Sequence, residues 1–298
     1  MIKKILWATD GSEDSFASLK YAEILAKNCN AAIHGLAVLT SESLPYNNAL
    51  SEKEKKSQSQ ILEKNKAKFL EKLEKIKRNL DKENLQFTYA IAKGAASKKI
   101  VETAQQEDFN LIAMGKGRSA YNFILGGTLI RVLRNCTIPI LTARENGPKI
   151  RIKRILVPLD LSHGLTAGSD YAYKLSQIFN ADIYLVHIIE TAEHNFTSDI
   201  IEKIKTNTKK EMGYLLGKSN LGDSVKIEVE VAKNAWVGIT ELARENDFDL
   251  IVMMTYEGII MKKEFIGSTT WKVIQESEVP VITLSPNKYI MKMTGDAK

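Results

Sequence analysis

The chain has 298 residues, enough for two domains, because single hydrophobic cores rarely grow beyond about 250–300 residues. Its hydrophobic content of 44% and charged content of 26% are ordinary for a globular protein. No apolar run approaches the ~20 residues that a membrane span needs, and the first residues lack the apolar core of a signal peptide. Cys29 and Cys136 form no spacing motif and are expected to be reduced thiols. We therefore expect a cytoplasmic protein without a membrane partner.

The net charge of +6 raises the question of a nucleic-acid partner. The lysine-rich segment 51–84 also carries many glutamates, and aromatic residues do not alternate with the lysines as a stacking platform for bases would require. The lysines therefore indicate solvated helices, and nucleic acid is not an expected partner.

In the first half of the chain, short apolar runs alternate with segments of helical periodicity. The runs that predict strands are 2–9, 32–39, 86–92, 111–115 and 138–143. The segments that predict helices are 15–29, 57–80, 97–107 and 127–134. Short apolar runs suit strands that are covered on both faces, and right-handed crossovers between parallel strands then give an open, doubly wound α/β sheet.

The predicted helix 57–80 has one apolar face, which we expect to pack on its own sheet. The apolar residues of this face are Leu62, Phe69, Leu73, Ile76 and Leu80. The polar stretch 41–60 is expected to form a mobile loop over the carboxyl edge of the sheet.

The second half of the chain repeats the first in the same order. The matching segments are 3–6 with 153–156, 21–26 with 171–176, 30–33 with 180–183, 92–95 with 232–235, 108–112 with 247–251, and 138–141 with 279–282. This is a tandem duplication with a linker near 144–149. The predicted domains are therefore 1–145 and 151–287, followed by a C-terminal tail, 288–298.

Three parts of the first copy meet at the carboxyl edge of the predicted sheet. They are Asp10, Val38 and the stretch 114–128. Doubly wound sheets bind ligands at this edge, near the topological switch point. The stretch 114–128 is a glycine-containing loop before a helix, where backbone N–H groups can collect around phosphate. The sequence therefore predicts an anion site here, although the pattern does not name the ligand.

The motifs at these positions resemble the universal stress protein family, tandem type, over nearly the whole chain. They are segments 5–12, 114–117, 126–128 and 138–141 in the first copy, and 155–160, 267–269 and 279–281 in the second. The resemblance implies two Rossmann-like, open, five-stranded parallel sheets. It also implies that the last strands, 138–143 and 279–284, pair the copies into a pseudo-dimer, and that separated copies aggregate or homodimerise.

The resemblance further implies a stress-response protein that binds ATP or a related adenine nucleotide in the first copy. The family motif is G-x-x-G, nine residues, then G-[ST]; an Asp after the first strand faces the ribose, and a residue ending the second strand meets the adenine. The implied nucleotide-binding residues are Thr9, Asp10, Val38, Met114, Gly115, Gly117, Gly126, Gly127 and Thr128. Thr128, Lys116 and Arg118 are also candidate anion contacts.

Two alignments of the motif are open. The first keeps nine residues between Gly117 and Gly127, followed by Thr128. The second matches Gly126 with Gly267 and Gly127 with Ser268. We prefer the second, because it needs no gap through the last helix and strand; it leaves the first phosphate loop about two residues shorter than usual.

The second copy departs further from the motif. Asp160 and Ile188 correspond to Asp10 and Val38, but Met254 and Glu257 replace the two leading glycines. A methionine side chain blocks close approach of the backbone, and a carboxylate repels phosphate. We therefore expect a degenerate second site.

No residue is predicted to be catalytic, because no serine–histidine pair has a recognisable elbow and no carboxylates pair at a fixed helical spacing. His34 and His187 fall in strands and should pack in or beside the sheets. His163, His187 and His194 leave a metal site in the second copy as an alternative, but we assign no metal ligands.

Asp10 and Asp160 also have a plain interpretation as turn residues, and Ser12 or Asp14 is expected to cap the following helix. Three classes of function stay open. They are a nucleotide-responsive stress protein with unidentified protein partners, a pure interaction protein that has lost its ligand, and an enzyme that is at most a slow ATPase or a metal-dependent activity. A homodimer of the full chain is a further hypothesis.

Overall fold

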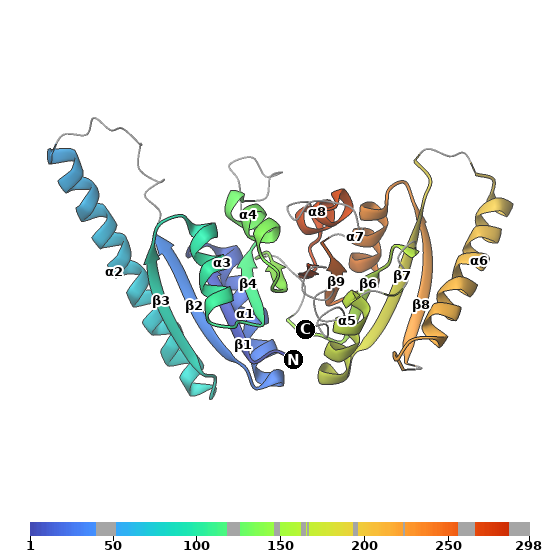
Figure 1. The fold of residues 1–298 in the computed structure, drawn as a ribbon, viewed down its shortest axis with the longest axis horizontal. Helices are drawn as coiled ribbons and strands as arrows, with labels where there is room; N and C mark the ends of the chain where they lie inside the picture. Colours follow the sequence, from blue (N-terminus) through green and yellow to red (C-terminus); the bar gives the residue numbers. More distant parts are fainter. Residues whose placement is uncertain are drawn as a thin grey trace, which may run out of the picture.

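The structure is a computed structural model that describes residues 1–39, 52–117, 126–145, 150–161, 165, 167–192, 196–222, 224–255 and 266–285. Of residues 52–62 and 65 only the backbone is described. Two halves of similar build lie side by side, with helices α2 and α6 at opposite outer ends (Figure 1). None of the helices in these ranges is long and apolar enough to cross a membrane.

Strands and helices alternate through both halves, as the sequence predicts. The strands are β1 (Lys4–Thr9), β2 (Ala32–Leu39), β3 (Phe87–Lys93), β4 (Leu111–Gly115), β5 (Ile140–Ala143), β6 (Arg154–Pro158), β7 (Asp182–Glu190), β8 (Val225–Ala232), β9 (Leu250–Met254) and β10 (Val281–Leu284). The helices are α1 (Glu13–Cys29), α2 (Glu52–Lys82), α3 (Ala96–Gln106), α4 (Gly127–Asn135), α5 (Ala167–Phe179), α6 (Ser198–Gly217), α7 (Ala235–Glu245) and α8 (Ser268–Glu276).

All ten strands form one sheet in the order β3-β2-β1-β4-β5-β10-β9-β6-β7-β8. Strands within each half pair in parallel, and β5 pairs antiparallel with β10 at the centre. The order within each half reverses between β1 and β4, and again between β6 and β9, which are the switch points where doubly wound sheets bind ligands. The predicted doubly wound fold and the predicted pairing of the two last strands are both confirmed.

The central seam is nearly symmetric. Leu141 lies opposite Ile282, and both are at most 1% exposed. On either side, the Thr142 hydroxyl donates to the Val281 carbonyl and the Thr283 hydroxyl donates to the Ile140 carbonyl, each at 3.3 Å. The seam thus buries two edge strands that would otherwise present apolar side chains and unpaired backbone groups.

Helices cover both faces of the sheet. One buried cluster joins residues of α1, α2, α5 and α6 to the sheet, and the second joins residues of α3, α4, α7 and α8 to the opposite face. Trp7 is fully buried in the first cluster, and its indole N–H donates to the carbonyl of Ser15 at 2.7 Å. The inner strands are therefore buried on two sides, which explains their continuous apolar runs, whereas the outer strands β3 and β8 are only partly buried.

Several predicted boundaries are wrong by a few residues, and one by more. Helix α2 begins at Glu52, so residues 52–60 are helical and do not belong to a loop. Lysine, glutamate and glutamine favour helices even where no apolar periodicity marks them. The rest of the predicted loop, 41–51, lies outside the described residues. Strand β5 begins at Ile140, because Pro139 has no N–H to donate to a neighbouring strand.

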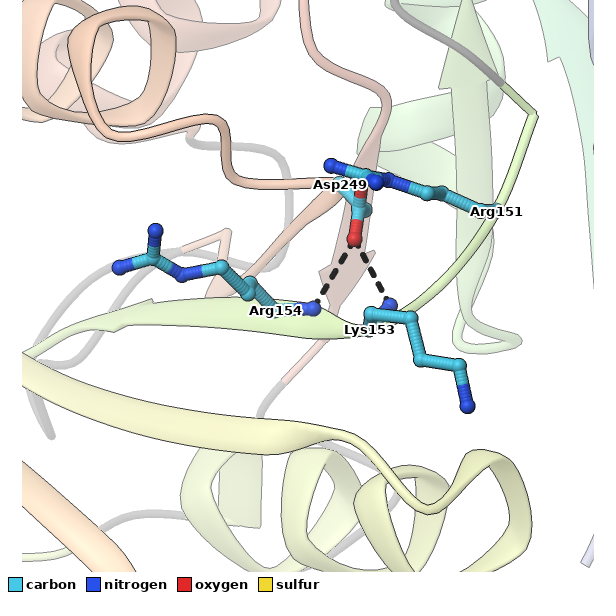
Figure 2. Close-up of polar contacts among 4 residues, drawn as sticks. All are labelled: Arg151, Lys153, Arg154 and Asp249. Atoms are coloured by element: carbon cyan, nitrogen blue, oxygen red, sulfur yellow. Dashed lines mark hydrogen bonds and ion pairs between the residues drawn. The ribbon is translucent and has the colours of Figure 1, made fainter.

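In each half, one side chain just before the fourth strand accepts hydrogen bonds from backbone N–H groups at the start of the first strand. The carboxylate of Asp249 accepts the N–H groups of Lys153 and Arg154 at 2.7 and 3.0 Å, and the Arg151 Nε at 2.8 Å (Figure 2). In the first half the amide oxygen of Asn110 accepts from two successive N–H groups, those of residues 3 and 4, at 2.7 and 3.0 Å. The repeated D-F-[ND]-L-I segment therefore contains a clamp, charged in one copy and neutral in the other.

Candidate functional site

The ends of β1, β2 and β4 and the start of α4 surround a cavity of about 220 Å³ at the carboxyl edge of the first half. All nine residues that the sequence assigns to nucleotide binding line it: Thr9, Asp10, Val38, Met114, Gly115, Gly117, Gly126, Gly127 and Thr128. Leu36, Ala96 and Ile100 add an apolar wall beside Val38. The structure therefore brings the predicted residues together, and their binding of a nucleotide stays a prediction.

The first turn of α4 opens into this cavity. Its N-cap residue is Gly126, and no side chain of the described residues caps the helix there. The first N–H groups of a helix have no intrahelical partner, and the helix dipole adds partial positive charge to them. Gly127 and Thr128 lie at this turn and line the cavity. The turn is suited to an anion.

The loop before α4 is closed by its own backbone. The N–H of Gly126 donates to the carbonyl of Lys116 at 3.3 Å, and in the second half the N–H of Gly267 donates to the carbonyl of Thr255 at 2.9 Å. Gly126 and Gly267 are also the N-caps of α4 and α8. The alignment that matches these two glycines is confirmed. Residues 118–125, which include Arg118, lie outside the described residues.

Two glycines of this loop have structural reasons of their own. A Cβ on Gly115 would lie 2.6 Å from the backbone nitrogen of Ser15 and 2.7 Å from the carbonyl carbon of Asp14, so no side chain fits between β4 and the first turn of α1. Gly117 has φ +73°, a conformation that side chains rarely adopt. Gly115 is therefore required by helix packing and Gly117 by a turn, whether or not a ligand binds.

The turn after β1 is built from its own side chains. The Thr9 hydroxyl accepts the Gly11 N–H at 3.0 Å, and a carboxylate oxygen of Asp10 accepts the Ser12 N–H at 2.9 Å. The Ser12 hydroxyl accepts the Ser15 N–H at 3.3 Å, so the predicted cap at Ser12 is confirmed. Asp10 is exposed at the cavity and also acts as a turn residue, which combines its two interpretations.

Lys116 lines the cavity, but its amino group is bonded to the second half of the chain, so its side chain does not present its charge to an anion there. Its side chain is only 4% exposed, and its ammonium group donates to the carbonyl of Ser277 in the second half at 2.6 Å. Burial lowers the pKa of Lys116 well below its ordinary value, and the nearby Arg144 lowers it further. The sequence gives no sign of this contact, because 161 positions separate the two residues.

The second half has a larger cavity, of about 390 Å³, in the equivalent place. Asp160, Ile188, Met254, Gly267 and Ser268 line it. Met254 occupies the position of Gly115 and is 6% exposed, so a side chain stands where the first half has none. The larger volume of this cavity does not by itself make a phosphate-binding loop. Glu257 lies outside the described residues.

The histidines do not gather into a metal site within the described ranges. Nδ1 of His34 lies 2.8 Å from the Thr88 hydroxyl, and burial lowers the pKa of this imidazole. Nδ1 of His187 lies 3.0 Å from the Leu159 carbonyl, which can only accept, so this nitrogen carries a proton. The described residues contain no group of three His, Cys, Asp or Glu side chains that could hold a metal ion. His163 and His194 lie outside them.

The fold and the cavities define a tandem, doubly wound α/β protein with a candidate anion site at a switch point. A sequence model of the universal stress protein family matches residues 1–144 and 151–285. The chain therefore belongs to the universal stress protein family, with two tandem domains.

Individual relatives are distant. The chain is 25% identical to a universal stress protein of Synechocystis sp., over 95% of this chain and 99% of that protein. It is 28% identical to a universal stress protein of Methanocaldococcus jannaschii, over 49% of this chain and 84% of that protein. The crystal structure of a universal stress protein from Archaeoglobus fulgidus has a TM-score of 0.70 and 21% identity, covering 95% of this chain and 98% of that one, and supports the fold.

Proposed function

We propose that this protein is a nucleotide-responsive stress protein that binds ATP or a related adenine nucleotide in its first domain. The observation that carries the proposal is the convergence of nine residues from four separate segments on one cavity beside the start of α4. The helix N-terminus would meet phosphate, and the apolar wall around Val38 would meet a flat base.

The second domain is proposed not to bind ATP. Its cavity is larger, but Met254 stands at the strand end where the first domain has Gly115. The expected stoichiometry is therefore one nucleotide for each chain.

Gly126→Asp tests the proposal directly. Gly126 has φ −57° and ψ 133°, and the nearest atoms to an added Cβ lie at 3.7 Å, so a side chain fits without strain. Aspartate is also a favourable N-cap, so the fold should be kept. Its carboxylate would stand where phosphate binds, and like charges in such a contact cost several kcal/mol, or roughly a hundredfold in affinity.

Calorimetric titration with ATP, and mass spectrometry of gently purified protein, would measure the effect. Gly126→Asn is the matched control, because it caps the helix without the charge and should bind more tightly than Gly126→Asp. Gly267→Asp places the same charge in the second domain and should leave binding unchanged. A wild-type protein that carries no nucleotide and gives no saturable heat with ATP would reject the proposal and favour a pure interaction protein.

A further inference from the structure

Helix α8 of the second domain ends against residues of the first domain. Carbonyl groups in the last turn of a helix lack intrahelical partners, and cations near them are favourable. Helix α8 has no basic residue in its own last turn. Instead, the Gln275 carbonyl accepts from the guanidinium of Arg144, and the carbonyl of Ser277, the C-cap residue, accepts from the ammonium group of Lys116.

One of these two donors belongs to the candidate nucleotide site. Lys116 lies between Gly115 and Gly117, in the loop that precedes α4. Its N–H donates to the Ala143 carbonyl at 3.1 Å, and its own carbonyl accepts the Gly126 N–H at 3.3 Å. Lys116 therefore joins three elements: the end of β5, the start of α4 and, through its side chain, the end of α8.

We propose that Lys116 is a positioning residue that fixes the glycine loop of the first site against α8, so that the first site is complete only with the second domain in place. The part that concerns ligand affinity rests on the proposed function. The anchoring itself does not, because it concerns the loop without a ligand.

The amino group of Lys116 is buried, and its hydrogen-bond partner lies in the second domain. A buried ammonium group is costly unless it is well bonded, and this one has a short contact of 2.6 Å to Ser277. Burial lowers the pKa of Lys116 most and Arg144 lowers it further, whereas the carboxylates of Asp14, Glu276 and Glu278 raise it. Two of these carboxylates belong to the second domain, so the setting of the lysine is shared between the domains.

The second domain provides the contrast. Thr255 occupies the position of Lys116, and its N–H and hydroxyl both donate to the Leu284 carbonyl, at 2.8 and 3.2 Å. Its carbonyl accepts the Gly267 N–H. These partners all lie in the second domain. The loop of the second domain is thus held by its own domain, while that of the first reaches across.

Hydrogen exchange of the full chain without ligand tests the anchoring. Lys116→Met keeps the length of the side chain and removes its donor, so the Ser277 carbonyl loses this partner. We expect amide exchange at Gly126 and in the last turn of α8 to become about tenfold faster, while the Thr255→Val control leaves these amides unchanged. Lys116→Gln, which keeps a shorter donor, should be intermediate and serves if Lys116→Met does not fold. Unchanged exchange at Gly126 in a folded variant overturns the proposal.

Titration with ATP tests the consequence for the site. Lys116→Met should weaken ATP binding about tenfold, within the usual range of coupling between sites, and Thr255→Val should not. ATP should also slow exchange at the end of α8 in the wild type but not in Lys116→Met, a readout that a merely structural role would not give. Wild-type affinity in Lys116→Met overturns the proposal. If the wild type binds no ATP, the proposed function fails, and the ligand-free exchange still decides the anchoring.

Discussion

The two domains of this protein end the same strand in different ways. At the end of β4, Gly115 lets the first turn of α1 approach so closely that even a Cβ would meet the backbone. At the end of β9, the same position is Met254, a buried side chain beside a larger cavity. Helix α1 begins at Glu13, and α5 begins at Ala167, four positions later in the repeat.

A glycine in a ligand loop can therefore be required by packing as well as by a ligand. The Gly-x-Gly opening of the first loop resembles a phosphate motif, yet Gly115 contacts a helix and Gly117 makes a turn. The domains also differ in how they depend on each other, because Lys116 reaches α8 while Thr255 bonds within its own domain. Three experiments test these differences between the two domains.

The largest effect is expected from separating the domains. Chains 1–145 and 151–287, produced apart, would expose β5 and β10, whose Leu141 and Ile282 are at most 1% exposed in the intact protein. Exposed apolar edge strands pair with other chains. We expect each half to aggregate or to homodimerise, as measured by sedimentation. Clean monomers of either half would show that the seam is not needed to cover these edges.

The next effect concerns Gly115. Gly115→Ala should lower the free energy of unfolding by about 3 kcal/mol, because overpacking against the backbone of α1 forces the strand or the helix to move. Gly127→Ala, in the first turn of α4, meets nothing within 4 Å and should raise stability by up to about 1 kcal/mol. Urea unfolding of the two variants measures both. Equal stability of Gly115→Ala and the wild type would leave the ligand as the sole reason for this glycine.

The sequence predicts the fold more completely than the site, for physical reasons. Strands such as β2 and β4 match their predicted ranges, because doubly buried strands leave long apolar runs in the sequence. The start of α2 is missed, because its first residues are charged and lack an apolar face. Packing and phosphate binding both call for a glycine at Gly115, so the pattern cannot separate them. The bond from Lys116 to Ser277 depends on how the two domains meet, which no local pattern records.

The smallest expected effect concerns the charge that distinguishes the two clamps, neutral Asn110 and charged Asp249. Tyr21, in α1 of the first domain, is 3% exposed. Burial raises its pKa to about 12, and the negative charge of Asp249 in the second domain contributes to the rise. In the unfolded chain a tyrosine loses its proton near pH 10. Between about pH 10 and about pH 12 the folded state therefore binds more protons than the unfolded state, and stability falls as the pH rises.

Two pKa units correspond to about 2.7 kcal/mol at most, and Tyr21→Phe should remove this part of the alkaline loss. Urea unfolding at pH 9, 10 and 11, compared between wild type and variant, isolates it from the titration of other tyrosines and lysines. Asp249→Asn makes the second clamp resemble the first. It should lower the pKa of Tyr21 only in part, and so reduce the alkaline loss of stability without removing it, because burial is the larger cause of the raised pKa. If Asp249→Asn leaves the alkaline loss unchanged, the charge of Asp249 does not contribute to the raised pKa of Tyr21.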